Sequence, residues 1–115
     1  MKKQYWENEV RPVVNEILSD SEKYKNDEQC FITAYQIVTL VNKEKSDIKR
    51  EFPTGGEGAG TATLAQIIAW YLSNDDYFND RIERRFLSTK GLDEFIFNGG
   101  NVPSTEEFSM FRFKY

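Results

Sequence analysis

The chain contains no histidine and a single cysteine, Cys30, among its 115 residues. Without an imidazole it cannot build Ser-His or Cys-His nucleophiles, histidine acid–base chemistry near neutral pH, or histidine-containing zinc sites. One thiol makes neither an internal disulfide nor a thiolate zinc site, which is typical of a reducing compartment. Only carboxylate-based sites remain open, and we expect a protein that is not an enzyme and carries no metal and no cofactor.

Long hydrophobic runs are also missing. No segment approaches the roughly 18 to 20 apolar residues of a transmembrane helix, and no apolar stretch follows Lys2 and Lys3 as a secretory signal requires. Charged residues make up 30% of the chain and aromatic residues 15%, a balance of solvated surface and bulky core material. We therefore expect a cytoplasmic protein in which residues 1–115 form a single domain.

Acidic side chains outnumber basic ones, 19 to 15, so the formal net charge is -4. A field of this sign repels nucleic acid and favours basic partners.

Two segments carry the same pattern for the start of a helix, with Thr33 three residues before Gln36 and Thr63 three residues before Gln66. In such a capping box the Thr side chain accepts from the backbone N–H of the later residue, whose own side chain accepts from the Thr N–H. The pattern predicts helices that begin directly after the two threonines. They are expected to end near residues 42–45 and by residue 74.

A further helix is expected at the N-terminus, where apolar residues recur at helical spacing. The stripe consists of Trp6, Val10, Val13, Val14, Ile17 and Leu18. Pro12 lies inside the pattern and has no N–H to donate. We expect either a helix start near Asn8 to Glu9, which places Pro12 in the first turns, or a kink at Pro12.

The pattern changes to that of strands after Arg85. The strongest signal is near the C-terminus, where apolar and basic residues alternate through Phe111, Arg112, Phe113, Lys114 and Tyr115. Further strands are predicted at 95–97 and at 82–87, the latter joined to the next through Lys90-Gly91. Helices followed by a small antiparallel sheet indicate an α+β fold.

About three helices followed by a hairpin or small sheet resemble a winged-helix domain, with residues 63–73 in the place of the recognition helix and 95–115 as the wing. The chain also resembles a set of small uncharacterised bacterial proteins that share the spacing of three segments. These are Phe31-Ile32-Thr33-Ala34-Tyr35-Gln36-Ile37, Gly55-Gly56-Glu57-Gly58-Ala59-Gly60 and Leu64-Ala65-Gln66. The resemblance covers residues 31–115 and implies a fold, but neither an activity nor a site residue.

Glycines at positions 55, 56, 58 and 60 precede the second capping box. Glycines before a helix N-terminus can expose backbone N–H groups to a phosphate. A P-loop, however, continues with Lys and Ser or Thr, where this chain has Thr61-Ala62, and a Rossmann turn follows an apolar strand, where this chain has the charged residues 49–51. We interpret the cluster as a connector and not as a nucleotide site.

Basic residues interleave with aromatic ones in the strand region: Arg81, Arg84, Arg85, Arg112 and Lys114. They could contact phosphates, but the predicted helix after Thr63 has no Lys or Arg to place in a DNA groove. We favour a solvated strand face with cross-strand ion pairs. A winged-helix transcriptional regulator that binds DNA as a homodimer remains the alternative function.

Acidic and aromatic residues gather at the end of that helix and just beyond it: Trp70, Asp75, Asp76, Tyr77, Phe78 and Asp80. Aromatic residues in such positions most often belong to the core, and acidic residues there most often lie on the solvated surface. Together they also suit a partner-binding patch, in which aromatics anchor the contact and acids steer it. Our first functional hypothesis is a small acidic protein-binding module of the immunity-protein or antitoxin kind, which neutralises a basic protein partner by occlusion.

Overall fold

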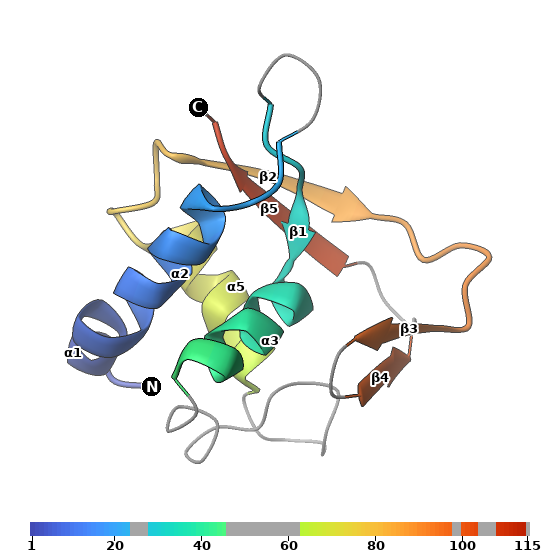
Figure 1. Ribbon diagram of the computed structural model, residues 1–115, viewed down its shortest axis with the longest axis horizontal. Helices are drawn as coiled ribbons and strands as arrows, with labels where there is room; N and C mark the ends of the chain where they lie inside the picture. The colour runs from blue at the N-terminus through green and yellow to red at the C-terminus, as the bar shows by residue number, and fades with distance from the viewer. Residues whose placement is uncertain (24–27, 46–62, 98–99, 104–107, 115) are drawn as a thin grey trace.

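The computed structural model describes residues 1–23, 28–45, 63–97, 100–103 and 108–114 (Figure 1). An N-terminal helical stretch comprises α1 (Lys3–Tyr5), the π-helical turn η1 (Trp6–Val10) and α2 (Arg11–Ser19). Two further helices are α3 (Ala34–Glu44) and α5 (Leu64–Asn74). The strands are β1 (Ile32–Thr33), β2 (Ile82–Leu87), β3 (Glu94–Phe97), β4 (Gly100–Pro103) and β5 (Phe108–Phe113). The predicted α+β class is confirmed.

Helices α3 and α5 begin at the two predicted capping boxes. The Gln36 N–H donates to Thr33 Oγ1 at 3.2 Å, and the Thr33 N–H donates to Gln36 Oε1 at 2.7 Å. The same reciprocal pair joins Thr63 and Gln66, at 3.2 and 3.1 Å. Both threonines are buried, so these bonds satisfy backbone donors that water does not reach easily.

The N-terminal helical stretch runs through Pro12. It begins at Lys3, so the expected start near Asn8 is wrong. The chain accommodates Pro12, near the start of α2, by placing a π-helical turn directly before it, in which the Arg11 N–H donates to the Trp6 carbonyl. The wider turn relieves the contact that a proline ring makes with the preceding turn of an α-helix.

The last strand of the chain lies in the middle of a sheet. A three-stranded antiparallel sheet has the order β1-β5-β2, and β3 pairs with β4 in a separate antiparallel hairpin. Strand β1 comes before α3 and was not predicted, since two residues are too short to show a period. Residues 95–115 therefore do not form one continuous wing, and the winged-helix resemblance is not confirmed.

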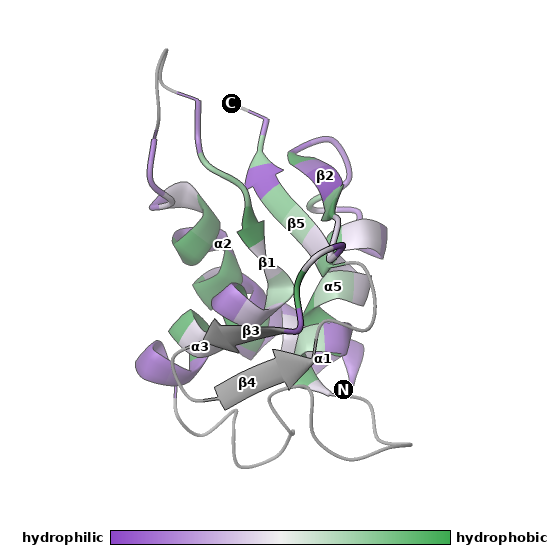
Figure 2. Ribbon diagram, turned by 90° about the vertical axis from the view of Figure 1, so that its right-hand side faces the viewer, coloured by the Kyte–Doolittle hydropathy of each residue, from purple (hydrophilic) through white to green (hydrophobic). Residues whose placement is uncertain are grey.

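The core lies between the helices and β5. Trp6, Phe78 and Phe111 are its largest fully buried side chains, and the apolar stripe of the N-terminal helical stretch is buried as predicted. Figure 2 shows hydrophobic residues on α2, β1, β5 and α5. No helix within the described ranges combines the length and the apolar character needed to cross a membrane.

The predicted turn at Lys90-Gly91 is present after β2. The Leu92 N–H donates to the Thr89 carbonyl at 3.0 Å, and Gly91 has a φ of +86°. A positive φ at the third position of a four-residue turn favours glycine. The glycine cluster at 55–60 and Tyr115 lie outside the described residues.

Candidate functional site

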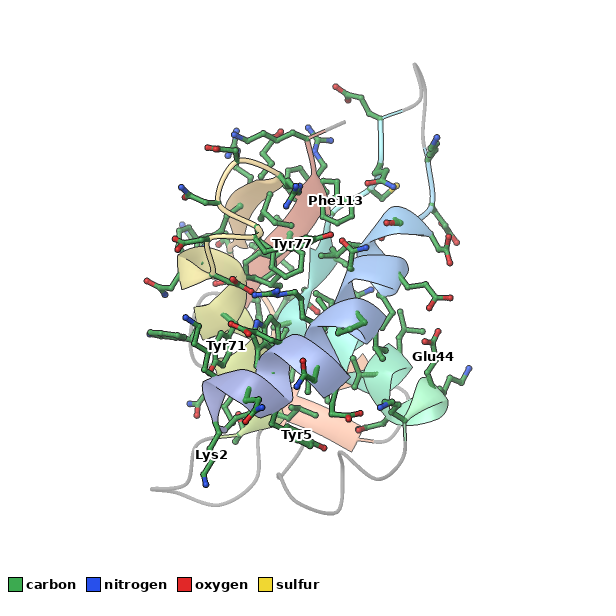
Figure 3. All side chains as sticks on the ribbon, turned by 90° about the vertical axis from the view of Figure 1, so that its left-hand side faces the viewer. Lys2, Tyr5, Glu44, Tyr71, Tyr77 and Phe113 are labelled. Atoms are coloured by element: carbon green, nitrogen blue, oxygen red, sulfur yellow. The ribbon has the colours of Figure 1, made fainter. Side chains whose placement is uncertain are left out.

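A groove of about 500 Å³ lies between the N-terminal helical stretch and the end of α5. We call it the N-terminal groove. Its lining consists of Lys3, Trp6, Glu7, Arg11, Trp70, Tyr71, Asn74, Asp75, Asp76 and Tyr77. Figure 3 shows Tyr71 and Tyr77 on this side of the molecule, near the N-terminal helical stretch. The volume is in the range of ligand-binding clefts.

Three aromatic rings form one wall of the groove and lead from the core to the surface. Trp6 is fully buried and stacks on Tyr71, with centroids 4.4 Å apart and planes within 9°. Tyr71 contacts Trp70 edge to face at 5.1 Å. Trp70 is 59% exposed. The exposed ring of Trp70 is therefore supported by Tyr71, which in turn stacks on the buried Trp6.

Asp75 lies in the groove lining, where it binds two residues of the N-terminal helical stretch, Trp6 and Arg11. The Trp6 Nε1–H donates to its Oδ2 at 2.7 Å. Arg11 donates from Nε to Oδ2 at 2.9 Å and from Nη2 to Oδ1 at 3.0 Å. This is the two-pronged geometry that a guanidinium makes with a carboxylate. The Asp75 side chain is only 7% exposed, so it is a structural anchor of the groove.

The environment of Asp75 favours its ionised form. Burial by itself raises the pKa of this carboxyl, because a buried charge is poorly solvated. Hydrogen bonds from Arg11, Trp6 and the Tyr77 N–H, together with the positive charge of Arg11, outweigh burial and hold the pKa of Asp75 below its ordinary value.

Two arginines lie over the ring of Tyr77. The Arg11 guanidinium is 5.0 Å from the ring centroid and that of Arg81 is 4.3 Å from it. The Tyr77 hydroxyl donates to Asn15 Oδ1 at 3.0 Å, and the Tyr77 N–H donates to Asp75 Oδ1 at 3.1 Å. Asp75 thus caps the turn after α5.

The other charged residues of the groove lining differ in whether they form ion pairs. Glu7 lies 3.8 Å from both Lys3 and Arg11. Asp76 is exposed and makes no ion pair with any residue that the structure describes. Across the lining, Glu7, Asp75 and Asp76 oppose Lys3 and Arg11, which leaves one negative charge in excess.

Comparisons with protein-family models, with curated proteins and with solved structures found no match for the chain.

The predicted partner-binding residues divide into separate places. Trp70, Asp75, Asp76 and Tyr77 line the groove. Phe78 is fully buried in the core, where it contacts Trp6 and Phe113, so it is not an accessible anchor. Asp80 is exposed and is not part of the groove lining.

Sequence reasoning missed the other half of the groove. Trp6 was assigned to the apolar stripe of the N-terminal helix. Nothing in the local pattern of Trp6 or of Arg11 points to Asp75, which is 69 and 64 positions away. The one available signal was a tryptophan among otherwise aliphatic core positions, because a buried indole N–H needs an acceptor.

The basic residues of the strand region are largely engaged within the molecule. Arg112 is held by Glu83 at 3.1 Å and by the Gln29 carbonyl at 3.1 Å, and it lies over the ring of Phe31. This includes the predicted cross-strand ion pair. Arg84 donates to Ser73 Oγ, and Arg85 pairs with Glu83. Arg81 covers Tyr77, and Lys114 is exposed.

Within the described ranges no three His, Cys, Asp or Glu side chains gather in a way that could hold a metal ion.

Proposed function

We propose that this chain is a small, non-enzymatic protein-binding module of the immunity-protein or antitoxin kind. It acts in the cytoplasm by covering a basic surface of another protein with its N-terminal groove. The observation that carries this proposal is Trp70, which is 59% exposed at a groove whose other walls are ordered by the Asp75 contacts. Tryptophan is prominent among residues that dominate binding energy at protein interfaces.

The charge of the groove supports a basic partner. Lys3 and Arg11 are each within ion-pair distance of a carboxylate of the lining, whereas Asp76 has no such partner among the described residues. The excess negative charge agrees in sign with the net charge of -4. Complementary charge raises the association rate and excludes partners of the wrong sign.

DNA binding by a homodimer is the competing hypothesis, and it has less support. The exposed side chains of α5, Gln66, Trp70, Ser73 and Asn74, include no basic residue. A helix that enters a DNA groove normally carries positive charge toward the phosphates. Arg84 and Arg85 are exposed on β2, and they are the residues on which a DNA contact would depend.

The decisive experiment compares partner capture by the wild type and by groove variants in lysate of the native organism. Trp70→Ala and Asp76→Lys should lose a basic protein that the wild type retains, and salt should release it. Phe86→Ala is the matched control, since Phe86 is 58% exposed but lies on β2 outside the groove lining. Equal capture by all variants contradicts the proposal. Salt-sensitive binding of random duplex DNA that is lost in Arg84→Glu with Arg85→Glu favours the alternative.

A further inference from the structure

The N-terminal groove already binds one guanidinium, that of its own Arg11. The Asp75 carboxylate accepts two hydrogen bonds from Arg11, and the ring of Tyr77 lies 5.0 Å from the Arg11 guanidinium carbon. A carboxylate paired with an aromatic face is a general arrangement for holding a planar cation. The molecule uses guanidinium–aromatic contacts elsewhere too, for Arg81 on Tyr77 and Arg112 on Phe31.

The same groove contains a further carboxylate and a further aromatic ring that are both exposed. Asp76 and Trp70 both line it and both are exposed. In the described part of the chain Asp76 makes no ion pair, and no guanidinium lies over Trp70. The two side chains thus repeat the elements that hold Arg11, and no cation of the described residues occupies them.

We propose that the N-terminal groove receives an arginine side chain of a basic protein, with its guanidinium against Trp70 and paired with Asp76. The inference rests on the proposed function for the source of that arginine. Whether the groove binds a guanidinium group at all is independent of the proposed function, because that depends only on the residues of the groove lining.

The lining selects arginine over other ligands of similar size. An anion is disfavoured, because the groove lining has three carboxylates against two cations, and both cations already form ion pairs with carboxylates of the lining. A lysine ammonium can pair with Asp76. It is compact and strongly hydrated, however, and lacks the planar shape with which a guanidinium stacks on an indole ring. Guanidinium combines both contacts, and tryptophan is the best aromatic partner for a cation.

The test is a titration of the full-length chain with N-acetyl-arginine amide, followed by the NMR signals of the two indole N–H groups. The Trp70 signal should shift and saturate, and the Trp6 signal should move less, since Trp6 is buried and bonded to Asp75. N-acetyl-citrulline amide has nearly the same shape as the arginine compound but carries no charge, so it should produce no saturable shift of the Trp70 signal. Absence of saturation with the arginine compound, or equal binding of the citrulline compound, overturns the proposal.

Substitutions of Asp76 and Trp70 test which side chains contact the arginine compound. Asp76→Asn should weaken binding about two- to fivefold, the range expected for one partly exposed ion pair, and Trp70→Ala should abolish the saturable response. Asp20→Asn is the matched control, because Asp20 is also exposed but lies at the end of α2, outside the groove lining. Circular dichroism verifies that each variant is folded. Unchanged affinity in Asp76→Asn and in Trp70→Ala refutes the assignment.

The outcome separates this inference from the proposed function. If groove variants lose a protein partner while the arginine compound does not bind, docking stands and the arginine assignment fails. If the arginine compound binds at Trp70 and Asp76 while partner capture is independent of the groove, the guanidinium site stands and the docking proposal fails.

Discussion

The indole N–H of Trp6 donates a 2.7 Å hydrogen bond to Asp75, 69 positions further along the chain. Trp6 is fully buried, and a buried indole N–H that lacks an acceptor is costly. The same carboxylate oxygen accepts from Arg11 Nε at 2.9 Å. One side chain therefore fastens the N-terminal helical stretch to the end of α5 and defines the groove between them.

Removing the Asp75 carboxylate should destabilise the fold. Asp75→Ala leaves the Trp6 donor and the Arg11 charge without their acceptor, at an expected cost of about 2 to 4 kcal/mol in the free energy of unfolding. Urea denaturation measures it. Asp76→Ala is the control, and it should stay within about 0.5 kcal/mol of the wild type because Asp76 is exposed. Equal effects of the two changes would show that the Asp75 contacts add little.

Asp75 should also make stability depend on pH at the acidic end. Its pKa is lower in the folded chain than its ordinary value, so the folded state binds the proton less readily than the unfolded state. The resulting stabilisation is complete above about pH 5 and is lost as the pH falls below about 4 toward the folded-state pKa. Unfolding curves from pH 7 to pH 2.5 should show this loss, and in Asp75→Asn it should be smaller. An identical pH profile in the variant argues against the assignment.

The capping boxes should contribute measurably to stability. Thr33→Ala and Thr63→Ala remove the hydroxyl that accepts the Gln36 or Gln66 N–H, and each should cost about 0.5 to 2 kcal/mol. Thr39→Ala is the matched control in mid-helix, where the hydroxyl only donates back to the Tyr35 carbonyl. It should be close to neutral, because Ala is the better helix former. Losses of the same size at all these positions would mean that burial of the Thr side chain, not capping, matters.

Gly91→Ala should destabilise the turn through backbone conformation alone. No atom lies within 4 Å of the position that a Cβ would occupy, but the φ is +86°. An L-residue with a side chain pays about 1 kcal/mol or more there. Gly91→Asn should cost less, since Asn tolerates positive φ better. Thermal denaturation provides the comparison, and a neutral Gly91→Ala would contradict the turn geometry.

The two tryptophans should differ sharply in their effect on stability. Trp6→Ala removes a fully buried ring and should cost about 3 to 5 kcal/mol. Trp70→Ala changes a residue that is 59% exposed and should cost less than about 1 kcal/mol. The variants left with one tryptophan also report exposure, because acrylamide should quench Trp70 and spare Trp6. A large loss of stability in Trp70→Ala would mean that this ring serves the core.

Local features of the fold were predictable from the sequence. The starts of α3 and α5 follow from the capping boxes, and β2 has the predicted bounds, Ile82–Leu87. These signals arise from bonds or alternations that span only a few residues. The pairing of β5 with β1 and β2 had no such signal, because antiparallel partners distant in sequence carry no local mark of one another.

The candidate site was predictable only in part. Trp70, Tyr77 and Phe78 were grouped as bulky aromatics near the end of one helix, with either a core or a surface role. The structure separates them, with Phe78 fully buried, Tyr77 half-buried and Trp70 exposed. Sequence spacing could not separate them because the helix ends at Asn74, and the direction of the following turn depends on the Asp75 contacts.

By itself, then, the sequence determined the starts of α3 and α5, the strand at 82–87, the apolar stripe of the N-terminal helical stretch and the α+β class. Capping, alternation and amphipathic period act over a few residues and are written in adjacent positions. Only the tertiary structure decided the strand order, the burial of Phe78 and the groove. Those features depend on contacts such as Trp6 with Asp75, whose partners meet only after the helices have packed on β5.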